Sequence, residues 1–528
     1  MSTPRRSSPP LRSSEQAPRG PRMTSTLDPT ATPTPGAAET FDSLDPATGD
    51  VVGTHPVAGR EEVDAAVARA REAVDWWGNL SFDERAELLL TWRSVITRRI
   101  AQLADLSHRE TGKPHGDAQL EIVLAIEHIA WAARNAKKVL GARKVGSGLL
   151  MANQSATVAY HPLGVVGVIG PWNYPVFTPM GSIAYALAAG NAVVFKPSEY
   201  TPGVGQWLAD SFREVVQGRD VLQVVTGLGD TGNALCRARI DKLAFTGSGR
   251  TGKLVMAACA ANLTPVVIEA GGKDSLIVDE DADLAKAAEA ALWGGMANAG
   301  QTCTGTERVY VHRNVFDDFM TEILAQADGL RAAADSAAQI GPITMPSQLG
   351  IIRSHIDDAV AKGARVALGG PDAVGERFVQ PTILTHVPEH STAITEETFG
   401  PTLTINPVDS MEEAVRLTNA TQYGLAGAVF SRANGMSIAR RIRSGMTSVN
   451  SVISFAAVPA LPFGGVGQSG FGRIHGADGL REFTYAKAIT RQKFAPVMNL
   501  TSFARDAATD GKDAQLITLL HGGKQTLK

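Results

Sequence analysis

The chain has 528 residues, of which 44% are hydrophobic and 20% are charged, and its formal net charge is −3. This length exceeds what a single core ordinarily supports, so two or three domains are expected. The nearly balanced charge gives no indication of a nucleic-acid or membrane-surface partner. Three cysteines are too few for a disulfide framework, and they indicate a reducing compartment such as the cytoplasm.

The N-terminal part divides into a polar tail and a helical region. Residues 1–40 are rich in Ser, Pro, Thr and Arg, and this composition predicts a disordered tail. Residues 60–77 and 82–112 show apolar side chains at three- and four-residue spacing, which is typical of amphipathic helices. The second of these helices is predicted to end at Gly112.

Residues 163–195 carry no charge and are long enough to span a bilayer. Four interruptions, Pro171, Asn173, Pro175 and Pro179, make a lipid-exposed helix untenable. We therefore interpret the segment as a buried strand, a loop, a buried helix and a second strand.

Short apolar strands alternate with helices from this segment onward, in the stretches GVVGVIG, NAVVFK, VLQVVTG, KLAFTG and PVVIEAGG. Such alternation predicts a parallel sheet with helices on both faces. A second α/β region is expected from about residue 270 to residue 470.

Cys303 lies in the stretch NAGQTCTG among glycines and small polar residues, whereas Cys259 lies among apolar residues. Structural cysteines are usually surrounded by apolar side chains. A reactive thiol and a hydrogen-bonded loop cysteine both fit the setting of Cys303.

Gly247, Gly249 and Gly252 in FTGSGRTGK have G-x-G-x-x-G spacing, follow a predicted strand and open a predicted helix. The N-terminus of such a helix offers N–H groups to a phosphate, so the stretch predicts a nucleotide site. Glu269 lies about 20 residues further on, where this fingerprint places the acid that binds a ribose. A carboxylate at a strand end also fits a general base or a solvated acid.

Lys196 and Glu199 in KPSE close another predicted strand. They fit a surface turn, and they also fit a ligand contact, because open α/β sheets bind ligands at the carboxyl ends of their strands.

Seven stretches occur in a fixed order: GPWNYP, FKPSEYTP, FTGSGRTGK, EAGGKDS, NAGQTC, EETFGP and PFGGVGQSGFGR. Together they closely resemble the NAD(P)-dependent aldehyde dehydrogenase superfamily from about residue 41 to residue 495. The resemblance implies an α/β fold with a Rossmann-type cofactor domain, an α/β catalytic domain and a small oligomerisation element of strands.

By this resemblance Cys303 is the catalytic nucleophile and Glu269 is the base that activates the deacylating water. Asn173 supplies the side-chain amide of the oxyanion hole, together with the backbone N–H of Cys303. A base of this kind needs a carboxyl group whose pKa is raised by burial.

The resemblance also places the cofactor. Lys196 and Glu199 hold the adenosine ribose, so the ribose acid is Glu199 and not Glu269. The other implied cofactor contacts are Gly247 and Ser248 at the pyrophosphate-facing helix, Glu397 and Phe399 at the nicotinamide half, and Trp172. No metal site is implied. Glu199 should repel a 2′-phosphate, so NAD is expected to be preferred over NADP, with NADP use left open.

The implied domains are a disordered tail (1–40), a cofactor-binding domain (41–269), a catalytic domain (270–470), a return segment with an oligomerisation strand (471–497) and a C-terminal tail (498–528). Residues 142–160 are expected to contribute to the oligomerisation arm of a homodimer or homotetramer. The stretch DAQLITLL in the C-terminal tail is a candidate docking helix.

The expected activity is NAD-dependent oxidation of an aldehyde to the carboxylic acid through a Cys303 thiohemiacetal and thioester. A CoA-acylating semialdehyde dehydrogenase is a rival that would not need Glu269. A succinate-semialdehyde dehydrogenase, a cofactor-free cysteine hydrolase and a non-catalytic binding protein are further alternatives. The uncharged residues 176–195 and 444–471 favour an uncharged aldehyde as the substrate over a carboxylated one.

Overall fold

A computed structural model describes residues 39–496, 502–503 and 506–523. Most of the predicted tail, residues 1–38, lies outside the described residues, and Thr40 already begins strand β1 (Thr40–Leu44). Strand β1 pairs antiparallel with β2 (Val51–Pro56).

The N-terminal region is helical as predicted, with α1 (Arg60–Trp77) and α4 (His115–Leu140) among its helices. The single helix expected over residues 82–112 is wrong, because Arg99 leaves helical geometry with φ −109° and ψ 20°. The break separates α2 (Phe82–Arg98) from α3 (Ile100–Thr111) and lets each bury its own face. Gly112 ends α3 with φ +74°, a conformation that glycine adopts without strain.

The first large sheet has the strand order β17-β9-β8-β5-β6-β7 and is parallel except for β17. Its strands are β5 (Val165–Ile169), β6 (Ala192–Lys196), β7 (Leu222–Val224), β8 (Lys242–Gly247), β9 (Val266–Ala270) and β17 (Gly470–Phe471). Helices pack on both faces, as the alternation predicts. One face is covered by α1, α7 (Gly229–Arg237) and α8 (Gly249–Ala260), and the other by α5 (Phe177–Ala189) and α6 (Pro202–Val215).

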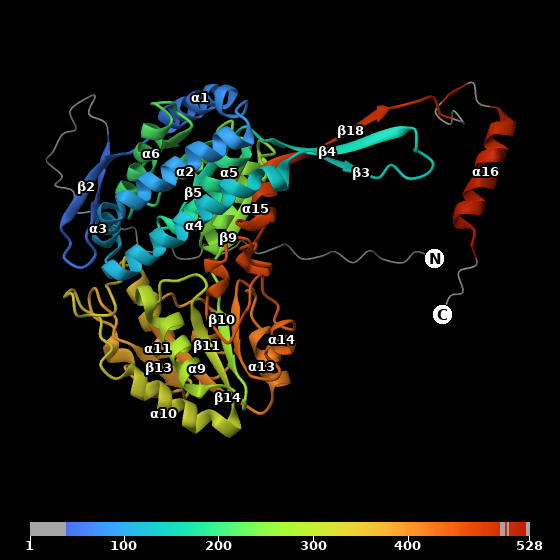
Figure 1. The fold of residues 1–528 in the computed structure, drawn as a ribbon. Coiled ribbons are helices and arrows are strands. Elements are labelled where there is room, and N and C mark those ends of the chain that lie inside the picture. Colours follow the sequence, from blue (N-terminus) through green and yellow to red (C-terminus); the bar gives the residue numbers. More distant parts are fainter. Residues whose placement is uncertain (1–38, 497–501, 504–505, 524–528) are drawn as a thin grey trace, which may run out of the picture. The chain divides into compact units, whose positions relative to one another are not determined.

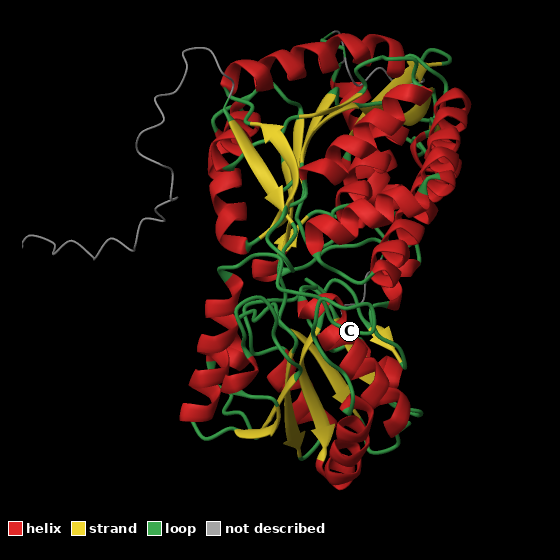
Figure 2. Cartoon of the chain, turned by 90° about the vertical axis from the view of Figure 1, so that its left-hand side faces the viewer, coloured by secondary structure: helices red, strands yellow, loops and turns green. Residues whose placement is uncertain are grey.

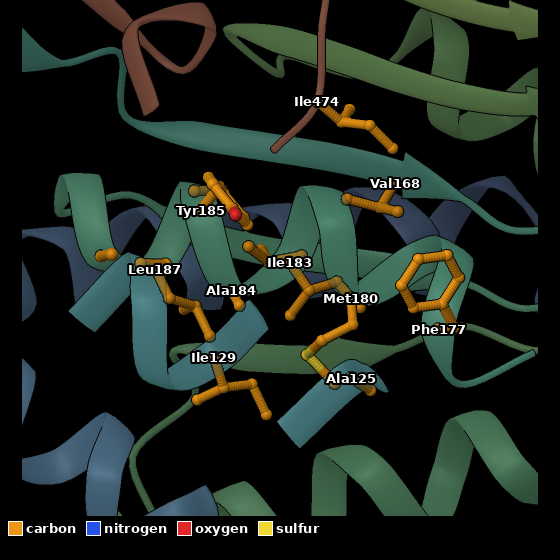
Figure 3. Packing of buried hydrophobic residues seen from close by; sticks show 14 of the residues in the cluster. Ala125, Ile129, Val168, Phe177, Met180, Ile183, Ala184, Tyr185, Leu187 and Ile474 are labelled. Carbon is orange, nitrogen blue, oxygen red and sulfur yellow. The ribbon is translucent and has the colours of Figure 1, made fainter. Parts of the chain in front are cut away.

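The uncharged segment 163–195 forms β5, a loop, α5 and β6, which confirms the buried interpretation. Every residue of α5 is buried. Figure 3 shows Met180, Ile183 and Leu187 of this helix packed beside α4. Within the described part of the chain, none of the helices combines the length and the apolar character that a membrane span requires.

The second large sheet has the order β12-β13-β14-β11-β10-β15-β16, with only the β12–β13 pair antiparallel. Its strands are β10 (Asp274–Val278), β11 (Thr306–His312), β12 (Arg365–Leu368), β13 (Thr382–Thr385), β14 (Thr402–Val408), β15 (Gly427–Phe430) and β16 (Ser448–Val449). One face packs against α9 (Leu284–Met296), α10 (Phe316–Ala327) and α11 (Gln348–Ala361). The other packs against α13 (Met411–Thr418) and α14 (Gly435–Ala439), while the short α12 (Thr392–Thr395) precedes β14.

The chain crosses from the first sheet to the second within three residues, because β9 ends at Ala270 and β10 begins at Asp274. The carboxyl ends of the first sheet's strands therefore face the amino ends of the second sheet's strands, with loops between them (Figure 2). The described residues from Thr40 onward form one compact unit, and the subdivision at residues 269 and 470 stays a prediction.

A third sheet is antiparallel and has the order β18-β4-β3. Its strands are β3 (Arg143–Val145), β4 (Gln154–Pro162) and β18 (Thr484–Gln492), and it extends away from the helices (Figure 1). Helix α15 (Gly476–Glu482) leads into β18. The stretch DAQLITLL lies in a helix, α16 (Ala507–His521), which buries none of its residues.

Candidate active site

Cys303 lies in the loop between α9 and β11, and the backbone of this loop explains its glycines and small residues. Asn298, Ala299 and Gly300 all have positive φ, of 53°, 56° and 69°. A Cβ at Gly300 would overlap the carbonyl oxygen of Gly400. Successive left-handed residues are strained and concentrate at functional sites. Cys303 keeps partial exposure, whereas Cys236 and Cys259 are each 1% exposed.

The carboxyl group of Glu269 contacts the Cys303 thiol. Its Oε1 lies 3.8 Å from Cys303 Sγ, and its Oε2 accepts a hydrogen bond of 3.2 Å from Thr246 Oγ1. Burial raises the pKa of Glu269 to about 7, in agreement with the expectation from the sequence. Burial and the carboxylates of Glu269, Glu397 and Asp274 raise the pKa of the Cys303 thiol well above its usual value.

Asn173 lies in the loop after β5 and is 5% exposed. Its side-chain Nδ2 donates to the backbone oxygen of Gln301 at 2.8 Å, two residues before Cys303. A side-chain amide carries two N–H groups, so this bond leaves one for a ligand. The structure therefore brings the three predicted catalytic residues, Cys303, Glu269 and Asn173, to one place.

The predicted ribose contacts also lie together. Lys196, at the carboxyl end of β6, is 5% exposed, and its Nζ lies 3.7 Å from Glu199 Oε2. Burial lowers the pKa of Lys196, and the neighbouring carboxylate partly opposes this shift. The Glu199 side chain is 42% exposed, so the pair presents a cation and an anion at the strand edge.

Gly247 ends β8, and Ser248 caps α8 by accepting a hydrogen bond from the backbone N–H of Thr251 at 3.2 Å. The first N–H groups of a helix have no partner within the helix, and the positive end of its dipole attracts anions. A Cβ at Gly249 would meet nothing closer than 3.6 Å, so the backbone is open at this point. These features fit a phosphate group.

Glu397 and Phe399 precede β14 and face the first sheet. Glu397 accepts a hydrogen bond of 3.1 Å from the backbone N–H of Gly272, and burial raises its pKa to about 8. Phe399 has φ +53°, and its ring meets that of Trp172 edge-on at 5.5 Å. The predicted cofactor contacts Trp172 and Phe399 are therefore neighbours.

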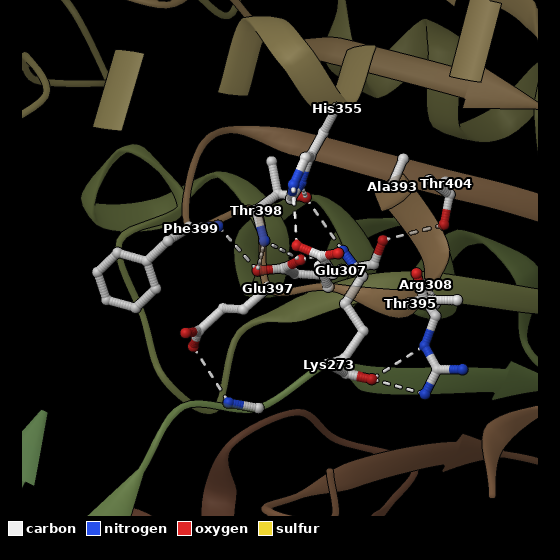
Figure 4. A network of polar contacts seen from close by, with 12 residues as sticks. Lys273, Glu307, Arg308, His355, Ala393, Thr395, Glu397, Thr398, Phe399 and Thr404 are labelled. Carbon is white, nitrogen blue, oxygen red and sulfur yellow. Dashed lines mark hydrogen bonds and ion pairs between the residues drawn. The ribbon is translucent and has the colours of Figure 1, made fainter. Parts of the chain in front are cut away.

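A buried ion pair that the sequence analysis did not single out holds the Glu397–Phe399 turn (Figure 4). Lys273 contacts Glu307 and donates to Thr398 Oγ1 at 3.1 Å. Glu307 accepts the backbone N–H groups of Thr398 and Phe399 at 2.9 and 3.0 Å. Lys273 follows the glycines of EAGGKDS, and Glu307 is the second residue of β11, so the signal in the sequence is a charged residue within a segment that is otherwise buried.

The arrangement of these residues follows from the two sheets. Glu269, Lys196 and Gly247 stand at the carboxyl ends of strands in the first sheet, where open α/β sheets bind ligands. Cys303 and Glu397 stand just before strands of the second sheet. The Cys303 thiol, the Glu269 carboxyl group and the Asn173 amide therefore lie beside the strand ends that suit a nucleotide. Such a set of groups can perform covalent catalysis on a carbonyl group.

Residues 34–489 match the family model described as "Aldehyde dehydrogenase family". A protein of Mycolicibacterium smegmatis named "Putative succinate-semialdehyde dehydrogenase", with NADP(+), is 38% identical over 461 residues, which cover 86% of this chain and 88% of that protein. The "4,4'-diapolycopene aldehyde oxidase" of a Methylomonas species is 35% identical over 470 residues, covering 88% of this chain and 86% of that protein.

Solved structures agree. An NAD-dependent aldehyde dehydrogenase from Sinorhizobium meliloti is similar with a TM-score of 0.83 and 33% identity, over 87% of this chain and 92% of that one. An NADP-dependent enzyme from E. coli is similar with a TM-score of 0.82 and 34% identity, over 86% of this chain and 95% of that one.

The contact between Glu269 and Cys303 predicts how the thiol titrates. Above pH about 7 the ionised Glu269 opposes formation of the thiolate, so Glu269→Gln should lower the pKa of Cys303. Alkylation by iodoacetamide, followed between pH 7 and pH 10, should therefore be faster in this variant than in the wild type at each pH. Cys303→Ser gives the background from the two buried cysteines. An unchanged or slower alkylation would contradict the electrostatic coupling.

Proposed function

The chain belongs to the aldehyde dehydrogenase family and is an NAD(P)-dependent oxidoreductase acting on aldehydes; from this premise we propose that Cys303, Glu269 and Asn173 carry its chemistry. The observation behind the proposal is the 3.8 Å contact between Cys303 Sγ and Glu269 Oε1, with Asn173 bonded to the same loop.

In the proposed reaction the Cys303 thiolate adds to the aldehyde carbon, and the carbonyl oxygen becomes an oxyanion. The free N–H of the Asn173 amide and the backbone N–H of Cys303 stabilise this charge. NAD(P), which Lys196, Glu199, Gly247 and Ser248 would hold, would supply the hydride acceptor at this point, and loss of the hydride would leave the acyl group on Cys303 as a thioester. Glu269 then removes a proton from water, which attacks the thioester carbon and releases the carboxylic acid.

The residues at the edge of the first sheet fit the cofactor. Lys196 and Glu199 offer a donor and an acceptor to ribose hydroxyls, and Gly247 and Ser248 open the helix that suits the pyrophosphate. The Trp172–Phe399 pair and Glu397, whose carboxylate acts on the Cys303 thiol, would hold the nicotinamide half.

Glu269 also distinguishes a hydrolytic aldehyde dehydrogenase from a CoA-acylating one. Transfer of the acyl group to a thiol needs no water-activating carboxylate, whereas hydrolysis does. A buried carboxyl whose pKa is about 7 beside the thiol is the group that hydrolysis requires. We therefore favour the hydrolytic dehydrogenase.

The substrate that the site favours is an uncharged, apolar aldehyde. Cys303, Tyr174 and Ile453 are partly buried and pack against the hydrophobic core cluster that contains Phe177 and Phe455. A carboxylate placed against such walls would lose several kcal/mol unless a cation met it. Of the two relatives named above, one is named for succinate semialdehyde, which carries a carboxylate, and the other for a diapolycopene aldehyde. The apolar surroundings of Cys303 favour the second kind.

The third sheet supports a homodimer or homotetramer. Strand β18 is largely exposed along its whole length, and an exposed strand edge is a template for pairing with another chain. Exposed apolar side chains on this sheet and its hairpin include Leu149, Tyr485 and Ile489.

The unpaired cysteines agree with a reducing location such as the cytoplasm.

Glu269→Gln should separate the two halves of the reaction. We expect a first burst of reduced cofactor that matches the enzyme concentration, followed by a steady state about 10²- to 10⁴-fold slower than that of the wild type. The wild-type steady state should rise through pH about 7 as Glu269 ionises. Cys303→Ser should show neither burst nor turnover. Loss of the burst in Glu269→Gln, with hydrolysis of the acyl-enzyme unaffected, would refute the water-activating role.

Cofactor preference should depend on Glu199. Its carboxylate accepts hydrogen bonds from ribose hydroxyls and repels a 2′-phosphate, while Lys196 at 3.7 Å weakens the repulsion. We expect a kcat/KM higher with NAD than with NADP, and a ratio that moves toward NADP in Glu199→Ser. A like charge in this site costs on the order of 1 kcal/mol, which corresponds to roughly five- to tenfold in that ratio. A wild-type enzyme that favours NADP would overturn the preference.

An aldehyde panel tests the substrate proposal. Hexanal and benzaldehyde should each give a kcat/KM at least tenfold above that of succinic semialdehyde, because the carboxylate must be desolvated against apolar walls. Succinic semialdehyde methyl ester is the matched control, since it keeps the chain and removes the charge. A clear advantage of the free acid over its ester would show that a cation reaches the substrate.

A further inference from the structure

Lys113 and Glu121 form an ion pair inside the protein, behind the catalytic residues. Lys113 follows the end of α3, Glu121 lies in α4, and neither side chain has any solvent exposure. Lys113 Nζ lies 2.6 Å from Glu121 Oε2. Burying two charges is unfavourable unless their geometry and their other hydrogen bonds compensate, so the further partners of this pair are informative.

Those partners are the two ends of one short loop. Lys113 Nζ donates to the backbone oxygen of Asn173 at 2.7 Å. Glu121 Oε1 accepts the backbone N–H groups of Val176 and Phe177 at 2.6 and 3.1 Å, where helix α5 begins. The pair therefore fixes the loop that carries Asn173 at its beginning and at its end.

The same loop is joined to the loop that carries Cys303. The Asn173 backbone oxygen also accepts from Asn298 Nδ2 at 3.0 Å, while the Asn173 amide donates to the Gln301 backbone oxygen. One residue later, Tyr174 Oη and Thr302 Oγ1 are 2.9 Å apart. A shift of Asn173 would therefore change the position of its amide relative to the thiol.

We propose that the Lys113–Glu121 ion pair positions the Asn173 amide against the oxyanion formed at Cys303, and so determines the rate of thiol addition and hydride release. The inference rests on the proposed catalytic roles of Cys303 and Asn173. Lys113 and Glu121 act through Asn173 and are positioning residues. A displacement of about 1 Å in such a donor is enough to cost about 10²-fold in rate.

The test uses the full-length enzyme with Lys113→Met and Glu121→Gln combined, because a single change would leave a buried charge without its partner. Met keeps the length of the lysine stem, and Gln keeps a carbonyl acceptor for Val176 and Phe177. The matched control makes the same two changes at Lys242 and Glu482, a pair whose side chains are 7% and 24% exposed. Lys242 begins β8, at the end of the strand away from Gly247.

Three measurements distinguish positioning from general damage: the burst of reduced cofactor, the alkylation of Cys303 and the dissociation constant of NAD. The burst of reduced cofactor with hexanal reports the steps that form an oxyanion, whereas alkylation of Cys303 by iodoacetamide forms none. We expect the Lys113/Glu121 variant to slow the burst 10- to 100-fold and to leave alkylation and the dissociation constant of NAD within twofold. The Lys242/Glu482 control should match the wild type in all three.

Asn173→Ala completes a double-mutant cycle. In that background the Lys113/Glu121 changes should have no further effect beyond twofold, because the donor that they position is gone. A burst within twofold of the wild type, alkylation that falls together with the burst, or an undiminished effect in the Asn173→Ala background would each overturn the inference. If Asn173→Ala itself leaves the burst intact, the proposed role of Asn173 fails and the inference fails with it. If only the pair variant is normal, the inference fails alone.

Discussion

A charge buried between two sheets must meet an opposite charge, be satisfied by hydrogen bonds or lose its ionisation, and this constraint organises the site. Two of the buried lysines form ion pairs with buried glutamates: Lys113 with Glu121, and Lys273 with Glu307. Within the described residues neither Glu269 nor Glu397 forms an ion pair, and burial raises the pKa of Glu269 to about 7 and that of Glu397 to about 8. The same desolvation thus yields rigid supports where charges are paired and a proton-exchanging carboxyl where a charge stands alone.

The supports and the reacting groups are divided between elements in a consistent way. The reacting groups lie on loops, Asn173 after β5 and Cys303 before β11, while the ion pairs tie those loops to helices and strands. Placement on loops permits the left-handed backbone at Asn298 and Ala299, and the hydrogen bonds around it hold that backbone in one conformation. Precision in the site is therefore a property of the buried polar contacts behind it.

Much of this architecture is readable from the sequence, because it depends on local patterns. The strand and helix in residues 163–195 follow from uncharged, proline-punctuated apolar runs, and Gly112 ends its helix as a glycine should. The break at Arg99 could not be predicted from the sequence, since both flanking segments keep helical periodicity and only tertiary packing separates them. The spacing of the glycine fingerprint alone predicts that Glu269 binds a ribose, whereas in the structure its Oε1 lies 3.8 Å from Cys303 Sγ.

The ion pair between Lys113 and Glu121 could not be predicted from the sequence for another reason. Each is an ordinary charged residue at a helix boundary or in a helix, and their common target, the loop at Asn173, lies more than fifty residues further along the chain. No local sequence pattern predicts that these two side chains contact the same loop. Contacts of this kind are decided by how helices pack across a sheet edge, which periodicity does not encode.

The pairing of β17 with β9 has a consequence for synthesis of the chain. Gly470 lies opposite Glu269, so the edge of the first sheet beside the base is closed by residues made about 200 positions later. At roughly 5–20 residues per second, a ribosome needs roughly 10–40 s to cover that distance. Throughout this interval β9 is an open edge strand, and open edges invite pairing with other chains. The nascent protein must therefore wait, with its first sheet incomplete, for the second sheet to be translated, and a chaperone that shields this edge would act during that interval.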